Sequence, residues 1–520
     1  MSVVIRGGTV VNGTGAPVRA DVVVEDGRVV SVGTAPEYAA SVIDAAGCIV
    51  CPGFIDMHSH NDYFLLDEEP FYGKLLQGVT TEVVGNCGFS AAPFNGNCRG
   101  FSRLCATILG NARGKADLSW ENYLNRLSRA RLVTNVVPLV GHGNLRACAM
   151  GESDRTPSIG EIGLMEEMLK ETLEQGGWGF STGLIYPPGV FSRTEEIVAL
   201  ARIVAKRGAL YATHMRKEPF VDEALEIARK SGVSLQISHM KMPGEGRRRR
   251  TQEILGEIDR ARKEGLDVSF DQYPYTASST TATVLLPPWM HEGGLSSLLE
   301  RLGTAGMREK AKEQMVRGSS EWQSSLTRAG ADRVIVSQVA SEKNRVYEGK
   351  SFAEIARETG KSPEDAVCDL ILEERGAVNM IVFSMSEESV RQMMRHHRGF
   401  IGSDGLPGRR PHPRLWGTFP RVLARYVREE KLLTLTEAVW KMSQGPAEKL
   451  GLKGRGKMEP GAVADIVVFD PEKVQDRATY EDPCLPPDGI RSVIVNGTVA
   501  VSDGRPTGAA AGHLLLRTAG

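Results

Sequence analysis

The sequence predicts an α/β protein built on a (β/α)8, TIM-like barrel, and three observations support this fold class. Short β-rich runs alternate with amphipathic stretches through the middle of the 520-residue chain, as they do in parallel βαβ units. The amphipathic stretches have helical spacing, because Ile162, Met165, Leu169 and Leu173 recur along one face of a single predicted helix. The two ends of the chain have a different character, with short β-rich runs separated by tight-turn dipeptides.

The candidate strands of the middle region number eight, as a closed barrel of this type requires. They are GFIDMHSH, VTTEVVGNC, TNVVPLVGH, GWGFSTGL, ALYATHMR, SLQISHMK, LDVSFDQYPY and GFIGSD. Active sites of such barrels lie at the carboxyl ends of the strands. Polar residues at these ends are therefore the candidates for function.

The chain ends predict a second, smaller domain. Runs such as SVVIRGGTVVNGTG near the start and SVIVNGTVAVSDGRP near the end contain NG and DG dipeptides, which are typical of β-hairpin turns. We expect residues 1–52 and 455–520 to form one β-sandwich domain that flanks a barrel of residues 53–454.

The interval between the seventh and eighth predicted strands, about residues 275–398, is longer than one crossover helix needs. It contains the further strand-like runs RVIVSQVA and VNMIVFSMS. We therefore expect an inserted subdomain here, placed over the active face as a lid or specificity element. The apolar run TTATVLLPPWM within it is compatible with a substrate pocket wall or with the core of the subdomain.

Composition excludes several classes of protein. The formal net charge of -1 argues against a nucleic-acid-binding surface, and no apolar run is long enough to span a bilayer. The start of the chain does not have the pattern of a secretory signal, so we expect a cytoplasmic protein. The eight cysteines show no disulfide framework, which favours free thiols with one available to a metal. The oligomeric state stays open.

Titratable residues follow most of the predicted strands. They are His58 and His60 on the first strand, Cys87 on the second, His142 on the third, His214 on the fifth, His239 on the sixth and Asp404 on the eighth. Side chains two residues apart in a strand point the same way, so His58 and His60 can converge on one ion.

A thiolate with neutral imidazoles is a ligand set that zinc prefers, and an open coordination position leaves room for water and substrate. Zinc lowers the pKa of bound water towards about 7 and polarises a carbonyl, so hydrolysis is the expected chemistry. Asp404 is the candidate general base. The position of His142 is compatible either with a hydrogen bond to a neighbouring residue or with a substrate contact.

At this point the sequence resembles the amidohydrolase superfamily and, within it, the D-aminoacylase branch of N-acyl-D-amino-acid deacylases. The motifs that carry the resemblance include PGFIDMHSHND, GVTTEVVGNCGFSAAP, GHGNLR, GLIYPPG, YATHMR, SHMK, FDQYPYTAS, GSDG, HPRLWGTFPRVLARYV and RATYEDP. They extend over residues 50–500 approximately, which is almost the whole chain.

The resemblance implies hydrolysis of the amide bond of a small N-acyl-D-amino acid, with release of a carboxylate and a free D-amino acid. It implies one tightly bound zinc ion on Cys87, His214 and His239. His58, His60 and Asp404 would surround a second position that is weakly filled or empty, and Asp404 would be the catalytic base and acid.

The resemblance also implies that Lys241, Tyr273 and Ser279 hold the α-carboxylate of the substrate, with Ser279 aligned to within one residue. One departure from the branch is the loop MPGEGRRRR after Lys241, where a small polar stretch with an aromatic residue is expected.

Two alternative functions are less compatible with the sequence. A cyclic-amide hydrolase of the dihydroorotase or hydantoinase type usually carries a carboxylated lysine on the fourth strand, and GWGFSTGL contains no lysine. A non-catalytic scaffold of the same fold would have lost metal ligands, whereas all six candidates are present in this chain.

Overall fold

The computed structural model describes residues 2–35, 41–110, 118–244, 246–319 and 322–518. Two groups of parallel strands form its centre, one in the order β6-β7-β8 and one in the order β9-β10-β11-β12-β13-β17. The strands are β6 (Phe54–Asp56), β7 (Val79–Val84), β8 (Asn135–Pro138), β9 (Val140–Gly141), β10 (Gly179–Gly183), β11 (Leu210–His214), β12 (Ser234–Ile237), β13 (Val268–Gln272) and β17 (Gly399–Ile401).

The two strand groups adjoin each other at both edges. Only Leu139 separates β8 from β9. At the other edge the backbone N–H of Met57 lies 3.5 Å from the carbonyl oxygen of Ile401, and a parallel bridge joins Ser59 to Gly405. The strands of the second group are those of the sequence prediction, and their parallel order places all their carboxyl ends on one face.

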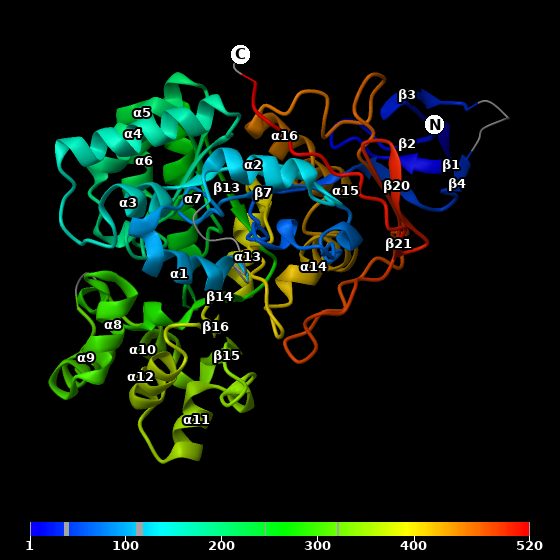
Figure 1. Ribbon diagram of the computed structural model, residues 1–520. Coiled ribbons are helices and arrows are strands. Elements are labelled where there is room, and N and C mark those ends of the chain that lie inside the picture. Colours follow the sequence, from blue (N-terminus) through cyan, green and yellow to red (C-terminus); the bar gives the residue numbers. More distant parts are fainter. Residues whose placement is uncertain (1, 36–40, 111–117, 245, 320–321, 519–520) are drawn as a thin grey trace.

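Helices surround the strands on the outside (Figure 1). They are α1 (Arg99–Leu109), α2 (Trp120–Arg129), α3 (His142–Met150), α4 (Ile159–Glu174), α5 (Thr194–Lys206), α6 (Asp222–Ser231), α7 (Arg248–Lys263), α13 (Glu387–Arg395), α14 (Arg414–Arg421), the π-helix η9 (Val422–Glu429), α15 (Leu435–Met442) and α16 (Gln444–Leu450). In α4, a capping box between Ser158 and Glu161 fixes the first turn. Met165 and Leu169 of this helix are fully buried, which confirms the predicted apolar face.

Strands from both ends of the chain share one nine-stranded sheet, in the order β21-β20-β19-β18-β5-β1-β2-β3, with β4 paired in parallel to the start of β1. They are β1 (Ser2–Val10), β2 (Val18–Glu25), β3 (Arg28–Gly33), β4 (Ser41–Asp44), β5 (Ile49–Pro52), β18 (Ile466–Phe469), β19 (Ile490–Val495), β20 (Thr498–Ser502) and β21 (Arg505–Pro506). The antiparallel pair β5 and β18 joins the two ends. Alternate residues of β18 face opposite sides of the sheet. Val468 packs against other side chains of this sheet, while Val467 packs towards the helices α14 and α15.

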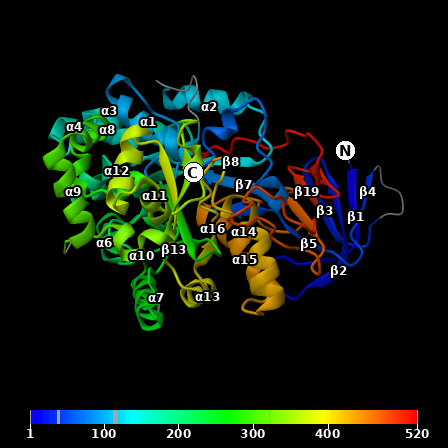
Figure 2. The same cartoon turned by 90° about the horizontal axis from the view of Figure 1, so that it is seen from below.

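Residues 277–383 form a third group of elements with a hydrophobic core of its own. The antiparallel strands β14 (Ala277–Thr281), β16 (Val378–Phe383) and β15 (Val334–Val339) are accompanied by α8 (Gly294–Gly303), α9 (Ala305–Arg317), α10 (Ser325–Ala329), α11 (Phe352–Thr359) and α12 (Pro363–Glu373). The predicted runs RVIVSQVA and VNMIVFSMS correspond to β15 and β16. Figures 1 and 2 place this group and the nine-stranded sheet at opposite ends of the molecule.

Among the described residues, no helix combines the length and the apolar character needed to cross a membrane.

Candidate metal centre and active site

The candidate metal ligands lie where the parallel strands end. His214 is the last residue of β11, while Cys87 and His239 follow β7 and β12 by two or three residues. Cys87, His239 and Asp404 have left-handed backbones, with φ angles of 55°, 34° and 49°. A left-handed conformation of a residue other than glycine costs about 1–3 kcal/mol and clusters at functional sites. These turns aim the three side chains into the same space at the mouth of the strands.

Cys87, His214 and His239 bring their ligand atoms together. The Sγ atom of Cys87 lies 3.3 Å from Nε2 of His239, which in turn lies 2.9 Å from Nδ1 of His214. Ligands of a tetrahedral zinc ion are separated by about 3.4–3.6 Å. All three residues are buried, and Nε2 of His214, on the side of the ring away from this group, has no hydrogen-bond partner among the described residues. The 3.3 Å distance is close to this separation and the 2.9 Å distance is shorter, so it is the donor set and its convergence that fit a metal ion with one open position.

Cys87 also belongs to a second group, with His58 and His60. The Nε2 atoms of His58 and His60 are 3.3 Å apart, and Nε2 of His58 lies 3.3 Å from Sγ of Cys87. Asp404 completes this group, because its Oδ1 atom lies 3.2 Å from Nε2 of His60 and 3.5 Å from Nε2 of His58. The predicted metal ligands thus form two adjoining positions that share one thiol.

Asp271 orients two of these ligands from behind. Its Oδ1 atom lies 3.2 Å from Nδ1 of His58 and accepts a 2.8 Å hydrogen bond from the backbone N–H of His239. A 2.8 Å bond from Nε2 of Gln236 holds the other oxygen. Carboxylates that accept from the far side of a metal-binding histidine fix its ring orientation. Sequence reasoning missed Asp271, although it lies within the quoted motif FDQYPY.

Asp404 is paired with a buried arginine that the sequence did not single out. Nη1 of Arg414 lies 2.9 Å from Oδ2 of Asp404. Burial alone would raise the pKa of Asp404, but the charge of Arg414 and the nearby His239 and His58 hold it well below its usual range. The carboxylate is therefore ionised at neutral pH and able to accept a proton. Arg414 belongs to the quoted motif HPRLWG, and its place ten residues after Asp404 was the available signal.

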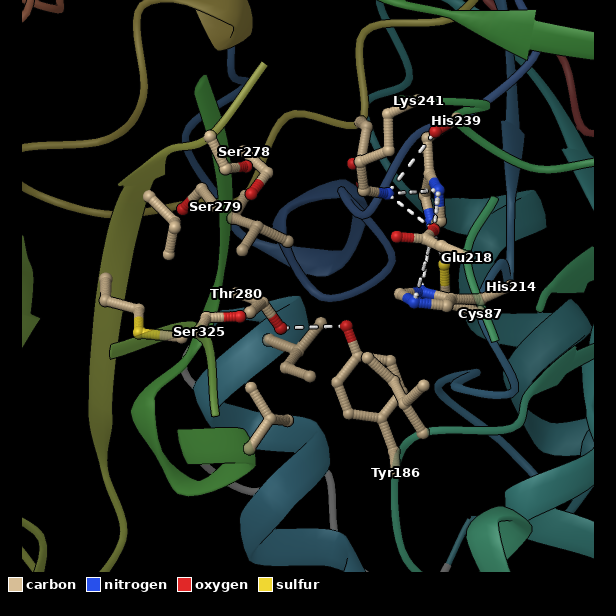
Figure 3. A pocket seen from close by; sticks show the side chains of 18 of the residues that line it. Cys87, Tyr186, His214, Glu218, His239, Lys241, Ser278, Ser279, Thr280 and Ser325 are labelled. Atoms are coloured by element: carbon tan, nitrogen blue, oxygen red, sulfur yellow. Dashed lines mark hydrogen bonds and ion pairs between the residues drawn. The ribbon is translucent and has the colours of Figure 1, made fainter. Parts of the chain in front are cut away.

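A pocket opens beside these groups (Figure 3). Its wall includes His60, Cys87, His214, His239 and Asp404, and also Lys241 and Ser279 from the predicted substrate-binding set. Ser279 lies in β14, next to Ser278 and Thr280, which also line the pocket. Tyr186 closes one side, with its hydroxyl 2.8 Å from Oγ1 of Thr280. Apolar side chains also line it: Phe89, Ile108, Ile185, Val284, Met380, Val382 and Leu406. Arg328, Ser325 and Ser384 add polar groups to the wall.

The run TTATVLLPPWM contributes both to the pocket wall and to the core of the inserted group. Val284 lines the pocket, whereas Leu285, Leu286 and Met290 belong to the core of the inserted group.

Two of the predicted substrate-binding residues do not line this pocket. His142 begins α3, where its Nε2 atom lies 2.8 Å from Oε1 of Glu196. Tyr273 packs against Arg414, whose guanidinium carbon lies 4.4 Å from the centre of the tyrosine ring. Burial raises the pKa of Tyr273, and its hydroxyl has no hydrogen-bond partner within the described part of the chain. Both side chains are buried next to the site rather than exposed in it.

Parallel strands with helices outside them, a Cys-His metal group at the strand ends and an ionised aspartate define a metal-dependent hydrolase of the TIM-barrel type. A family model, described as Amidohydrolase family, matches residues 41–233 and 341–501. The chain belongs to the amidohydrolase family.

Several relatives match over almost the full length. The chain is 39% identical to N-acyl-D-glutamate deacylase of Alcaligenes xylosoxydans xylosoxydans, with 100% of this chain and 97% of the relative covered. It is 36% identical to the D-aminoacylase of the same organism, with 99% and 97% covered. These matches confirm the resemblance to the D-aminoacylase branch.

Solved structures of the same branch are similar to this chain over almost its full length. N-acyl-D-glutamate deacylase from Bordetella bronchiseptica, complexed with zinc and a phosphonate mimic of the tetrahedral intermediate, gives a TM-score of 0.82 at 36% identity, covering 99% of each chain. A crystal structure of D-aminoacylase gives 0.84 at 36% identity, with the same coverage. A D-hydantoinase at 17% identity gives 0.55 and shares the fold alone.

Proposed function

We propose that this chain is a zinc-dependent N-acyl-D-amino-acid deacylase, which cleaves a linear amide into a carboxylate and a free D-amino acid. One observation carries the proposal: Cys87, His214 and His239 converge beside Asp404 in the same pocket that Lys241 lines. The full-length similarity to deacylases of N-acyl-D-glutamate, N-acyl-D-aspartate and other D-amino acids supports it.

In this proposal the tightly bound zinc ion is held by Cys87, His214 and His239. Bound zinc supplies polarisation of the amide carbonyl and stabilisation of the negative charge that develops on its oxygen. The position formed by His58, His60, Cys87 and Asp404 is a second, weaker site. The donor chemistry favours zinc over harder ions such as magnesium, because a thiolate is a soft ligand.

Asp404 moves the proton. Its Oδ1 atom, on the side away from Arg414, faces the histidine cluster. It takes a proton from the attacking water as the C–O bond forms, and later gives it to the leaving nitrogen as the C–N bond breaks. Arg414 keeps the carboxylate ionised between turnovers.

Lys241 is the proposed anchor for the α-carboxylate of the substrate, with hydroxyl groups of the Ser278–Thr280 strand beside it. Three contacts can distinguish the D- from the L-isomer at Cα. They are the anchor for the carboxylate, the fixed position of the carbonyl group and the pocket wall on the third side. Ser279 would contact the α-carboxylate of the substrate directly. Tyr273 and His142 are proposed to support the pocket from behind, through Arg414 and α3 respectively.

We also propose the domain organisation suggested by the sequence. The eight parallel strands of residues 53–454 would form one closed barrel, and residues 1–52 with 455–520 would form the flanking β-sandwich domain. Residues 275–398 would be the inserted subdomain, and it contributes β14, Val284, Met380 and Val382 to the pocket wall.

The test is a kinetic panel of N-acetyl-D-amino acids, with the L-isomers as controls and a dihydropyrimidine or hydantoin as the cyclic-amide control. The proposal expects hydrolysis of at least one D-isomer and no comparable activity on its L-isomer. Equal hydrolysis of both isomers would contradict the assignment to this branch. Hydrolysis of only the cyclic amide would favour a hydantoinase-type enzyme.

A further inference from the structure

We propose that Glu218 is a positioning residue that connects the metal centre to the substrate anchor through a single carboxylate oxygen. The inference rests on the proposed function, because it assigns Lys241 and the two histidines the tasks described above. Glu218 lies between β11 and α6, four residues after His214, and its side chain borders the pocket (Figure 3).

One atom of Glu218 makes three contacts. Its Oε1 atom lies 2.7 Å from Nζ of Lys241, 3.3 Å from Nδ1 of His239 and 3.6 Å from Nε2 of His214. The Glu218 side chain is only 15% exposed, so water does not replace these partners freely. Figure 3 shows the carboxylate at the junction of all three side chains.

The two histidine contacts fall on the ring nitrogens that face away from the metal group. His239 turns Nε2 and His214 turns Nδ1 towards the metal position. A ring nitrogen that binds a metal carries no proton, so the opposite nitrogen carries it and needs an acceptor. Those opposite nitrogens are the two that lie nearest Glu218 Oε1. Glu218 Oε1 is thus placed to hold the proton on Nδ1 of His239 at 3.3 Å, and it lies 3.6 Å from Nε2 of His214, where its charge favours a proton without a direct hydrogen bond.

Lys241 cannot take over this task. Its Nζ atom lies 2.8 Å from Nδ1 of His239, but an ammonium group only donates hydrogen bonds. When Nδ1 of His239 carries its proton, Lys241 must turn its hydrogens elsewhere, and Glu218 Oε1 and a substrate carboxylate are the suitable acceptors. The carboxylate of Glu218 therefore serves the metal ligands and holds the anchor at the same time.

The experiment measures zinc affinity and steady-state kinetics for Glu218→Gln. Zinc affinity is determined by competition with a chromophoric chelator in the absence of substrate. We expect it to fall about 10- to 100-fold, the range seen when carboxylates behind metal-binding histidines are removed. At saturating zinc, we expect KM for the best N-acetyl-D-amino acid to rise more than kcat falls, because the anchor is no longer held.

Two further variants separate positioning from general damage. Glu223→Gln makes the same change five residues later, at a carboxylate that pairs with Arg216 at 3.1 Å, and should leave zinc affinity and KM unchanged. Lys241→Met should raise KM without weakening zinc. Thermal unfolding of the metal-free proteins checks that each variant folds. If Glu218→Gln does not fold, Glu218→Asp, which keeps the charge on a shorter side chain, should show the same two changes to a smaller extent.

Zinc affinity of the Glu218 variant equal to wild type would overturn the inference while leaving the deacylase function intact. An unchanged KM would overturn the link to Lys241 in the same way. Failure of the proposed function has a different signature, since the wild-type protein itself would then hydrolyse no acylated D-amino acid.

Discussion

The buried ion pair of Lys74 and Asp56 lies where the first parallel strand, β6, meets the segment that follows the last one, β17, and its removal tests how the scaffold supports the site. Nζ of Lys74 lies 2.6 Å from Oδ2 of Asp56, and both side chains are fully buried. Asp56 also accepts hydrogen bonds from the hydroxyl of Ser403 at 2.6 Å, from the backbone N–H of Ser403 at 2.8 Å and from that of His58 at 3.1 Å. The pair thus holds His58 next to the residue that precedes Asp404.

Lys74→Met removes the cation and leaves the Asp56 carboxylate buried. Loss of one partner of a buried pair costs about 3–5 kcal/mol. Three hydrogen bonds to Asp56 remain, so we expect the free energy of unfolding to fall by a value near the lower limit, about 3 kcal/mol. Because His58 and Asp404 are attached to this cluster, kcat should fall as well. Urea unfolding followed by tryptophan fluorescence measures the first effect, and steady-state kinetics measure the second.

The double variant Lys74→Met with Asp56→Asn removes both charges and keeps an acceptor for the backbone N–H groups. It should recover most of the lost stability, because no uncompensated charge remains. Lys361→Met is the matched control at a partly exposed pair with Asp369, where Nζ and Oδ2 are also 2.6 Å apart; it should cost less than about 1 kcal/mol. A loss of stability in Lys74→Met no larger than in this control, or a double variant no more stable than Lys74→Met, would refute the reasoning.

Three further predictions follow from the site and its surroundings. Cys87→Ala should lose tightly bound zinc and activity together, measured by elemental analysis and turnover; full zinc content would show that the ion is held elsewhere. Asp404→Ala should keep the zinc but lower kcat about 10²- to 10⁴-fold, and a near-normal kcat would remove Asp404 as the base. Burial raises the pKa of Glu152 from 4.5 to about 7, so the folded protein binds this proton more tightly than the unfolded chain and loses stability as pH rises from about 4.5 to 7. Glu152→Gln should abolish that loss, with a gain at pH 8 of about 1–2 kcal/mol after allowance for partial exposure; an unchanged pH profile of unfolding would contradict it.

The strand ends could be predicted from the sequence because parallel strands bring their carboxyl ends to one face. That rule places Cys87, His214 and His239 together, although these residues are far apart in the chain. It left His142 open between a hydrogen bond to a neighbouring residue and a substrate contact. His142 also follows a strand but begins a helix, and its Nε2 atom lies 2.8 Å from Oε1 of Glu196. A position after a parallel strand predicts that the residue lies at the carboxyl ends of the strands, but it does not predict the direction of the side chain.

Glu218, Arg414 and the pair of Lys74 with Asp56 could not be found in this way. Glu218 and Lys74 lie in sequence beside charged or turn residues and look like parts of solvated loops. Asp56 and Arg414 lie within the quoted motifs PGFIDMHSHND and HPRLWG, but the motifs do not say which residues they contact. Their function depends on loop conformations that bring residues distant in sequence into contact. Arg414 forms an ion pair with Asp404, and Lys74 donates a hydrogen bond to Ser403. Such contacts are determined by tertiary packing, which periodicity and composition do not encode.

The central claim is that the working metal ion is held by Cys87, His214 and His239, rather than by the more conspicuous His58 and His60. Anomalous diffraction from crystals of the active protein, collected on both sides of the zinc absorption edge, tests it most directly. We expect one strong zinc peak within bonding distance of Cys87 Sγ, His214 Nδ1 and His239 Nε2, with a weaker peak or none between His58 and His60. A strong peak bound only by His58 and His60, in crystals of fully active protein, would contradict it.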